Sequence, residues 1–496
     1  MVLFDCAQGG AGGAVATVNV ADAAKGDGMS TAKPAGAAGM ACAYSLSRHP
    51  EKFDCEVWEA LPTAGGVATS CVVKSSDGME FEMNDQVQGG VPSYRNNLLM
   101  FEEFGFKSSP LKFRVCFGKG DNAWTNHSPS KLAERLQPEI EKFGKALKWI
   151  SRFEFIFVFV PINKVLKWWG FSDDFANRMV FPLTALFFGT GNQTPYVSAA
   201  IIARVFRDKE LALFHYSAER LLHGEPDVFA FENLENIFTT IAKKIPARVF
   251  VNRPVASVER GPKVTRVTDK FGRVAEFDDV VFTCSTEVTR DVLKSPSWLE
   301  RKLLANVRYF DDLIVTHEDH DYMEKEYEMH AADNEDMYFI RTDPEDPSKV
   351  EMSFNLSMYQ PHLLDAKGAR RNLYQTIFLD ARGKDRWTID AIDEKKILKK
   401  RWTRQFAHTW THFAKWVPFV RFIQNTKRTW YAGAVTVANT HEVAVMSGFA
   451  VAHRLGAPFP YFHDPLAYSQ MKLFMSVTHG TSLPLPKEFK NKHKAS

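Results

Sequence analysis

The stretch that decides the fold runs from Ala35 to Thr69 and reads AGAAGMACAYSLSRHPEKFDCEVWEALPTAGGVAT. It starts with Gly36 and Gly39 and continues in small and apolar residues, which is typical of a helix packed closely on a sheet. The residues CEVW then predict a buried strand that ends at Glu59. A helix followed by a strand is the second half of a β-α-β unit, so this stretch predicts an α/β fold of the dinucleotide-binding, Rossmann-like type.

The glycines and the acid of this stretch have the spacing of a dinucleotide site. A pyrophosphate must approach backbone N–H groups at a helix N-terminus, where a Cβ would block it. Gly36 suits that contact, and Gly39 allows tight packing of the helix on the sheet. Glu59 follows Gly39 by 20 residues, at the position of the acid that accepts the ribose hydroxyls. Gly65 and Gly66 let the backbone pass close to the pyrophosphate. The alternative is a helix that merely starts with small residues, followed by a chance glycine turn.

These residues resemble the FAD-binding start of the flavin amine oxidase, phytoene desaturase and protoporphyrinogen oxidase superfamily. Members carry G-x-G-x-x-G, then Glu, then Gly-Gly-Arg-x-x-Thr or Ser. This chain has Thr69 at the last position, but Pro34 replaces the first glycine and Val67 replaces the arginine. The phrases PSWLERKLLANVRYFDDLIVTHED and RTWYAG are similar to those of predicted NAD- or FAD-binding proteins of bacteria and fungi.

The resemblance covers residues 35 to about 460 and implies FAD as the cofactor. The QGG turn ending at Gly90 stands where the family brings backbone near the flavin ring, and RPVASVER contains the residue whose backbone meets the adenine. WYAGAVTVANTHE resembles the family's final motif, with Ala434 in place of its acid. The residues that the resemblance assigns to FAD are Gly36, Gly39, Glu59, Gly65, Gly66, Thr69, Gly89, Gly90, Val255, Gly433, His441 and Glu442.

The nucleotide-type segments lie far apart in the chain, which predicts one domain assembled from three pieces beside an α+β substrate domain. The predicted FAD-binding domain comprises residues 35–115, 232–300 and 425–460. The predicted substrate domain comprises residues 116–231 and 301–424, and residues 461–496 are expected to form a C-terminal tail.

The N-terminal residues 1–34 are rich in Ala and Gly and are expected to be mostly disordered. The polar MSTAKP stands where an apolar first strand should precede Gly36, and we hypothesise that an unusual N-terminal splice removed that strand. Residues Ala14 to Val20 could form a short substitute strand, but the loop to Gly36 is too long for a tight phosphate turn. Weak FAD binding would follow.

Other segments have clear local patterns. Residues 130–230 are predicted to be largely helical, and the turn at 270–272 separates two alternating runs that predict a hairpin. Residues 285–304 and an amphipathic segment from about 395 to 414 predict helices. The chain then has a strand at 428–432 and a helix from about 442 to 455.

Two histidine-containing segments invite functional hypotheses. His441 could move a proton beside the flavin, although a histidine just before a helix more often caps or packs. The cluster THEDHD, residues 316–321, suggests a metal, but a solvated loop is the preferred interpretation, and no metal site is predicted. The sequence leaves the catalytic residues unknown.

Composition excludes several partner classes. The net charge of +3 over 496 residues gives no basic field for nucleic acid. The longest apolar run, Phe153 to Pro161, is about half the ~20 residues that a bilayer span requires. None of the six cysteines forms a C-x-x-C pair, which fits a reducing cytoplasmic setting. The aromatic and lysine-rich segment Phe153 to Phe171 predicts either an apolar pocket, peripheral membrane contact or ordinary core packing.

The expected function is therefore an FAD-dependent oxidoreductase that removes a hydride from an apolar, lipid-like or unsaturated substrate, or from an amine. The alternatives are a flavin-dependent double-bond isomerase of unsaturated fatty acids and a protein that keeps the fold without catalysis. An NAD-only dehydrogenase is disfavoured by the flavin-type C-terminal motif.

Overall fold

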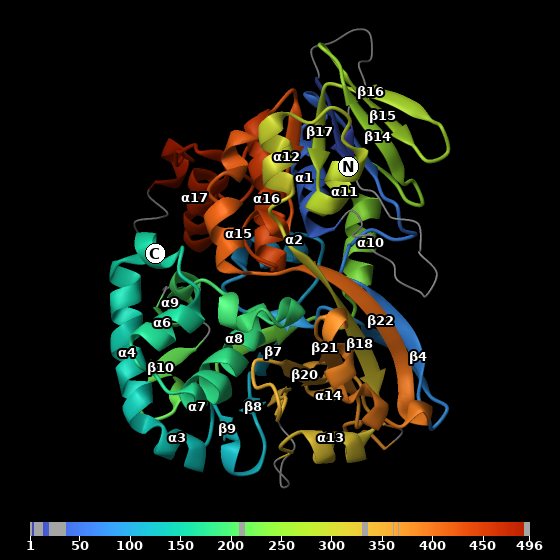
Figure 1. Ribbon diagram of the computed structural model, residues 1–496. Helices are drawn as coiled ribbons and strands as arrows, with labels where there is room; N and C mark the ends of the chain where they lie inside the picture. The colour runs from blue at the N-terminus through green and yellow to red at the C-terminus, as the bar shows by residue number, and fades with distance from the viewer. Residues whose placement is uncertain are drawn as a thin grey trace.

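The computed structural model describes residues 2–3, 13–18, 36–207, 214–329, 336–360, 362–365 and 367–490 (Figure 1). Two large sheets organise the chain. In Figure 1 the first sheet lies in the upper part of the molecule with helices α1 (Ala37–Ser47) and α16 (His441–Leu455). The second sheet lies in the lower part.

The first sheet has six strands in the order β13-β3-β1-β2-β17-β23, and β3 also pairs with β2. The strands are β1 (Val2–Leu3), β2 (Gly13–Val18), β3 (Phe53–Trp58), β13 (Arg248–Phe250), β17 (Asp279–Phe282) and β23 (Thr429–Tyr431). All neighbours are parallel except β1, which is antiparallel to β2 and β3. The parallel strands thus follow the order 3-2-1-4-5 of doubly wound folds, which agrees with the Rossmann-like class that the sequence predicted.

Strand β2 occupies the central position that appeared to be vacant in the sequence. It pairs with β3 through Gly13 and Ala14 and with β17 through residues 15–18. Most of the segment Ala14 to Val20, which the sequence offered as a substitute strand, is therefore confirmed as this strand, and the expectation that the sheet lacks its first strand is wrong. That expectation required the strand to stand immediately before Gly36, whereas the pairing strand comes from a small-residue segment earlier in the chain. Pro34 and the connection over residues 19–35 lie outside the described residues.

Helices α1 and α16 pack closely against each other. A Cβ on Gly448 of α16 would lie 2.2 Å from the carbonyl oxygen of Ala38 and 2.8 Å from the backbone nitrogen of Cys42, so only glycine allows this approach. Helix α17 (Pro465–His479) packs on α16 and buries Met471 and Phe474 in the same core. The segment expected to be a C-terminal tail is therefore part of the core.

The second sheet has seven strands in the order β22-β18-β21-β20-β19-β8-β9. The strands are β8 (Val115–Phe117), β9 (Trp124–Thr125), β18 (Tyr309–His317), β19 (Tyr338–Thr342), β20 (Val350–Asn355), β21 (Tyr374–Phe378) and β22 (Ile397–Phe406). The helix predicted over 395–414 is wrong for most of that segment, because β22 pairs along the whole of β18. Helical structure in this segment is confined to a short 3-10 turn at Glu394–Lys396 and to α15 (Trp410–Lys415). Long-range pairing has overridden the local helical pattern.

Helices cover one side of the lower part of the molecule, which contains the seven-stranded sheet (Figure 1). They come from residues 130–230, which the sequence predicted to be largely helical, although that segment ends in strands. The helices are α3 (Lys131–Arg135), α4 (Gln137–Arg152), α5 (Glu154–Phe157), α6 (Ile162–Trp168), α7 (Asp173–Phe175), α8 (Phe181–Phe188) and α9 (Ala199–Arg207). The strands are β10 (His215–Ser217), β11 (Leu221–His223) and β12 (Asp227–Ala230), and β12 pairs with β6 (Gly89–Gly90) and β7 (Ser109–Lys112).

The remaining elements follow the predicted order closely. The hairpin about residues 270–272 is confirmed within a three-stranded sheet, and residues 285–304 form two helices. These elements are α2 (Arg95–Glu103), α10 (Leu234–Lys244), β14 (Val255–Arg260), β15 (Thr265–Asp269), β16 (Val274–Phe277), α11 (Thr286–Val292) and α12 (Trp298–Leu304). Among the described helices, none is long and apolar enough to cross a membrane.

The THEDHD segment is not the solvated loop that was expected, because it comprises the end of β18 and the start of a helix, and Thr316, His317 and Asp319 are buried while Asp321 is exposed. His317 ends β18 and shares a 2.9 Å hydrogen bond with the Thr376 hydroxyl, and burial lowers the pKa of His317 to about 3. Asp319 caps α13 (His320–Glu326) by accepting a hydrogen bond from the Tyr322 N–H. Within the described part of the chain, no three His, Cys, Asp or Glu side chains gather where they could hold a metal ion.

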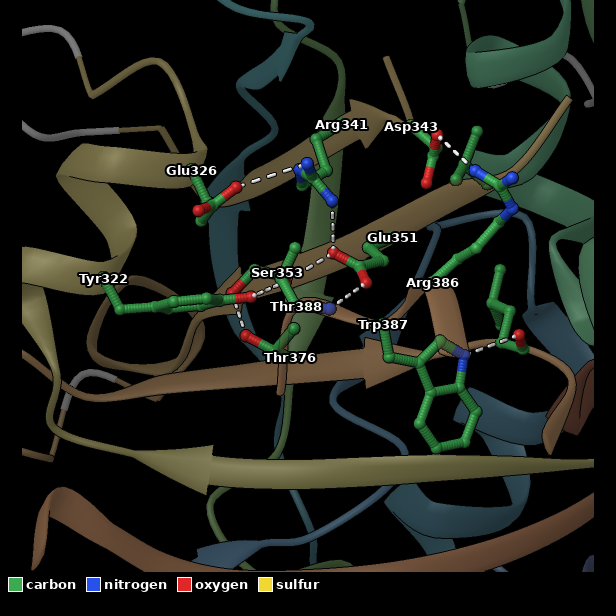
Figure 2. Close-up of polar contacts among 12 residues, drawn as sticks. Tyr322, Glu326, Arg341, Asp343, Glu351, Ser353, Thr376, Arg386, Trp387 and Thr388 are labelled. Carbon is green, nitrogen blue, oxygen red and sulfur yellow. Dashed lines mark hydrogen bonds and ion pairs between the residues drawn. The ribbon is translucent and has the colours of Figure 1, made fainter. Parts of the chain in front are cut away.

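A polar network beside this segment ties the seven-stranded sheet to the loop after β21. Arg341 forms ion pairs with Glu326 and Glu351, and the Thr388 backbone and hydroxyl both donate to Glu351 (Figure 2). The Tyr322 and Thr388 hydroxyls are 2.7 Å apart. Every charge in this set has an opposite charge as its partner, so we interpret the network as structural.

Candidate functional site

A cavity of about 220 Å³ lies at the carboxyl ends of the parallel strands. Residues 283–285 follow β17 directly and residues 433–435 follow β23, so these lining loops belong to the edge where doubly wound folds bind ligands. A second part of the lining comes from Ile314 of β18, Ile377 of β21 and Phe406 of β22. The cavity therefore joins a nucleotide-type strand edge to apolar side chains of the seven-stranded sheet.

The N-terminus of α1 and the glycine pair meet at this cavity. Gly36 is the N-cap of α1. Because glycine has no side chain, the first N–H groups of the helix are not capped by one. Gly36 forms an isolated parallel bridge with Gly65. Gly65 and Gly66 have φ angles of +133° and +75°, and a Cβ on Gly65 would lie 2.9 Å from the carbonyl oxygen of Ala68. Uncapped helix N–H groups beside a bare backbone are the arrangement that binds pyrophosphate.

The turn after β23 brings a third glycine to the cavity. Gly433 has a φ of +120°, and its N–H donates to the Ser447 hydroxyl at 2.7 Å. That hydroxyl donates in turn to the Ala444 carbonyl at 2.6 Å, so α16 fixes the turn. Ala434 lines the cavity at the position where the related motif carries an acid.

Glu59 directly follows β3, as the sequence predicted, and its side chain is fully buried. Its carboxylate accepts the Leu61 N–H at 2.7 Å. Burial in a poorly solvated position raises the pKa of Glu59 to about 8. Glu59 lies at the carboxyl end of a strand of the same sheet, but it does not line the cavity itself.

Thr69 supports the glycine pair from behind the cavity. Its hydroxyl donates to Asp85 at 2.5 Å, and Asp85 forms ion pairs with Arg401 and, at 3.1 Å, with Lys399 of β22. Burial opposes ionisation of Asp85, but Arg401, Thr69 and Lys399 together hold its pKa below the ordinary value. Thr69 therefore anchors the loop after Gly66 to the second sheet.

Glu442 contacts a helix. Its two carboxylate oxygens accept the backbone N–H groups of Asn96 and Asn97 at 2.9 Å and 2.8 Å, at the start of α2. Burial raises the pKa of Glu442 to about 7. The carboxylate therefore satisfies the N-terminus of α2, where a negative charge is also favoured by the helix dipole.

Of the remaining predicted residues, Gly89 lines the cavity and three do not. A Cβ on Gly89 would lie 1.9 Å from the Phe229 carbonyl oxygen, because β6 and β12 pair there. Gly90 belongs to the same pairing, Gly39 is buried inside α1, and Val255 starts β14 opposite Asp269. In all, the structure brings six of the twelve predicted residues to the cavity, namely Gly36, Gly65, Gly66, Gly89, Gly433 and His441.

His441 is the first residue of α16, and Thr440 before it is the cap, since its side chain accepts the Val443 N–H. The His441 ring packs edge to face on Phe238 at 6.0 Å. Burial lowers the pKa of His441 to about 4, so its imidazole is neutral at physiological pH. His441 packs at the cavity wall.

Several lining residues carried no recognisable sequence signal. Asn439 donates from its side chain to Gln405 at 2.6 Å and from its backbone to the His408 ring nitrogen at 2.8 Å. Tyr309 accepts the Thr286 N–H with its hydroxyl. Asn439 precedes α16, whereas Tyr309 comes from β18 and Gln405 from β22. Pairing within the second sheet brings Tyr309 and Gln405 to the glycine motifs.

A parallel sheet in 3-2-1-4-5 order with a glycine cradle at its switch point defines a dinucleotide-binding protein of the flavoprotein type. The sequence profile of the family described as flavin containing amine oxidoreductase matches residues 37–311, more than half of the chain. The chain therefore belongs to the flavin-containing amine oxidoreductase family and is an FAD-dependent oxidoreductase. This confirms the superfamily resemblance and the cofactor that the sequence motifs implied.

Solved structures share the fold over most of the chain. A CLA-producing fatty acid isomerase from P. acnes superposes with a TM-score of 0.59 at 15% identity, over 89% of this chain and 98% of that one. Putrescine oxidase bound to putrescine gives 0.58 at 13% identity, over 90% and 99%. Cyclohexylamine oxidase from Brevibacterium oxydans gives 0.57 at 13%, over 85% and 98%. No curated protein matched the sequence.

Proposed function

We propose that this FAD-dependent oxidoreductase acts on an uncharged, apolar substrate. The observation that carries the proposal is the chemistry of the cavity. Among the described residues that line it there is no Asp, Glu, Lys or Arg. A cationic amine would lose its hydration there without gaining a counter-ion, whereas a hydrocarbon chain would not.

In this proposal, backbone N–H groups bind the pyrophosphate of FAD. The uncapped N–H groups at the start of α1 and the backbone of Gly65 and Gly66 would take the pyrophosphate, and Glu59 would take the ribose hydroxyls. The Gly433 turn and the first turn of α16 would hold the ribityl chain and the flavin ring. When bound, FAD supplies a hydride acceptor at flavin N5.

The chain's own side chains would hold the substrate and exclude water. Ile314, Ile377 and Phe406 provide the apolar surface. The Asn439 side-chain amide donates to the Gln405 side-chain oxygen, so these two polar groups of the wall are paired within the protein. Such a wall holds an apolar chain by area and shape.

A second candidate is redox-neutral isomerisation of a double bond in an unsaturated fatty acid. A two-electron oxidation releases a proton as well as a hydride. Among the described lining residues no carboxylate or amine is present to receive the proton, and His441, whose pKa burial lowers to about 4, is a weak acceptor. Isomerisation releases no net proton, because hydride leaves one carbon and is returned to another. The neutral lining favours this candidate over oxidation of an amine.

The test is flavin bleaching under anaerobic conditions. The purified protein with bound FAD is mixed with an unsaturated fatty acid in detergent micelles or with a diamine such as putrescine, and the visible flavin band is followed. We expect bleaching or product formation with the fatty acid and neither with the diamine. Bleaching by the diamine alone would overturn the proposal.

Product mass separates the two candidates. Loss of two hydrogens from the fatty acid identifies oxidation, whereas an unchanged mass with a new conjugated-diene absorption identifies isomerisation. Absence of both with every apolar compound tested would contradict both candidates and favour a protein that keeps the fold without catalysis.

An apolar substrate has to reach the cavity from a lipid phase or from micelles. Peripheral membrane contact near Phe153 to Phe171 is part of the same proposal, since this segment combines aromatic and basic residues.

A further inference from the structure

Large apolar side chains are exposed together at the ends of α4, α5 and α6. Each is about half exposed or more, and Phe155 is 71% exposed. The five residues are Trp149, Phe155, Ile156, Phe159 and Trp168. Single exposed apolar residues are ordinary, but a group of this size marks an interaction surface. We call this group the 149–168 surface.

The helices do not need these side chains for folding. The same helices bury other side chains in the hydrophobic core that they share with the seven-stranded sheet, namely Ile150, Ile162, Val165 and Leu166. The exposed side chains lie on the other faces of the helices, so packing within the chain does not explain why they are apolar.

Ring contacts hold the three helix ends together. Trp149 stacks on Phe153 at 5.4 Å, which joins the end of α4 to the start of α5. Phe157 packs edge to face on Trp169 at 5.6 Å, which joins α5 to the residue after α6. The exposed residues therefore belong to one continuous surface.

Basic side chains surround this surface. Lys145, Lys148, Arg152, Lys164 and Lys167 are all exposed. Glu154 is the only acidic residue between 142 and 170, and it is paired with Arg204 at 2.7 Å. The whole chain carries a net charge of only +3, so its excess of positive charge is concentrated at this surface.

Backbone contacts connect the 149–168 surface to the cavity. The Ser198 hydroxyl donates to the Phe157 carbonyl, and Val197 next to it bridges to Thr409. The neighbouring His408 ring lies 4.9 Å from the ring of Phe406, which lines the cavity. A series of contacts thus runs from the surface through Ser198 and Thr409 to the cavity wall.

We propose that the 149–168 surface docks the protein onto an anionic phospholipid bilayer. Its aromatic side chains enter the interfacial layer, where amphipathic rings are favoured, and the surrounding Lys and Arg contact the anionic headgroups. This inference rests on the proposed function for its purpose, which is delivery of an apolar substrate, but the binding itself requires no turnover.

Flotation with defined vesicles tests the docking. The full-length protein with bound FAD is mixed with vesicles of phosphatidylcholine containing about one third phosphatidylserine, or of phosphatidylcholine alone. We expect flotation with the anionic vesicles at low salt, and at least about tenfold weaker binding to neutral vesicles or at high salt. Equal failure to float with both kinds of vesicle would overturn the inference.

Variants locate the contact. Phe155→Ser combined with Phe159→Ser should abolish flotation, and Lys164→Glu combined with Lys167→Glu should reduce it and its salt dependence. Phe271→Ser is the matched control, because Phe271 is 76% exposed in the turn between β15 and β16. A loss of flotation in the Phe271 variant equal to that in the double Phe variant would assign the binding elsewhere.

Failure of this inference is distinguishable from failure of the proposed function. Flavin bleaching is measured in micelles without vesicles, whereas flotation is measured without substrate. Flotation without bleaching by any apolar compound would sink the proposed substrate class and leave the docking surface intact.

Discussion

The backbone of Gly36 pairs with the backbone of Gly65 in an isolated parallel bridge. This contact joins the N-terminus of α1 to the loop after β3, although a helix and a strand separate the two glycines in the chain. Both glycines line the cavity. The cradle for the pyrophosphate is therefore one paired backbone structure, and the space beside Gly65 is already filled by Ala68 and Phe238.

Gly65→Ala is expected to lower the amount of bound flavin severely. The new Cβ would lie 2.9 Å from the Ala68 carbonyl oxygen and 3.2 Å from the Cβ of Phe238, so the loop must move. Gly78→Ala is the control, because Gly78 also has a positive φ but nothing lies within 4 Å of its Cβ position. Both variants pay about 1–2 kcal/mol of backbone strain. The ratio of flavin to protein absorption after purification should fall only for Gly65→Ala, and equal ratios would contradict the cradle.

Glu59→Gln should change how the stability of the FAD-free protein depends on pH. The folded pKa of about 8 lies above the ordinary value, so the folded state keeps a proton that the unfolded state releases. The contribution of Glu59 is fully present below its unfolded pKa and is lost as pH rises towards about 8, by about 1.4 kcal/mol for each unit between the two values. Urea unfolding should show the variant gaining on the wild type between about pH 5 and 8. A constant difference over that range would show that Glu59 is not buried as described. The variant should also bind FAD more weakly.

Ser447→Ala should loosen the Gly433 turn. The variant leaves the buried Gly433 N–H without its acceptor, which costs about 1–3 kcal/mol. We expect flavin fluorescence to be released at a lower temperature than in the wild type. Ser47→Ala is the matched control, because the Ser47 hydroxyl donates only to the Tyr44 carbonyl of its own helix. Release at the same temperature in both variants would mean that Ser447 does not hold the turn.

Ala16→Pro tests the central position of β2. Proline removes an N–H group from a strand that pairs on both sides, which proteins tolerate only at sheet edges. We expect loss of flavin and of cooperative unfolding. Ala16→Ser keeps the N–H group and should behave like the wild type. A proline variant with normal flavin content and normal unfolding would remove β2 from the sheet.

Local sequence carried much of the fold and half of the candidate site. The glycines at 36, 65, 66, 89 and 433 were found from sequence because tight turns and close backbone approach require glycine whatever surrounds them. The strand ending at Glu59 was found because its apolar run and following acid are adjacent in the chain. The role of Glu442 was missed, since its partners Asn96 and Asn97 are far away in sequence.

The sequence by itself determined the nucleotide-binding motifs, the class of fold and the flavin cofactor, because each depends on residue types at short, fixed spacing. Tertiary structure decided which segment became the central strand, since β2 is selected by pairing with β3 and β17 and not by its distance from Gly36. It likewise made β22 a strand against a local helical pattern. It also brought apolar side chains to the cavity, because Ile314, Ile377 and Phe406 come from strands that meet only through long-range hydrogen bonding.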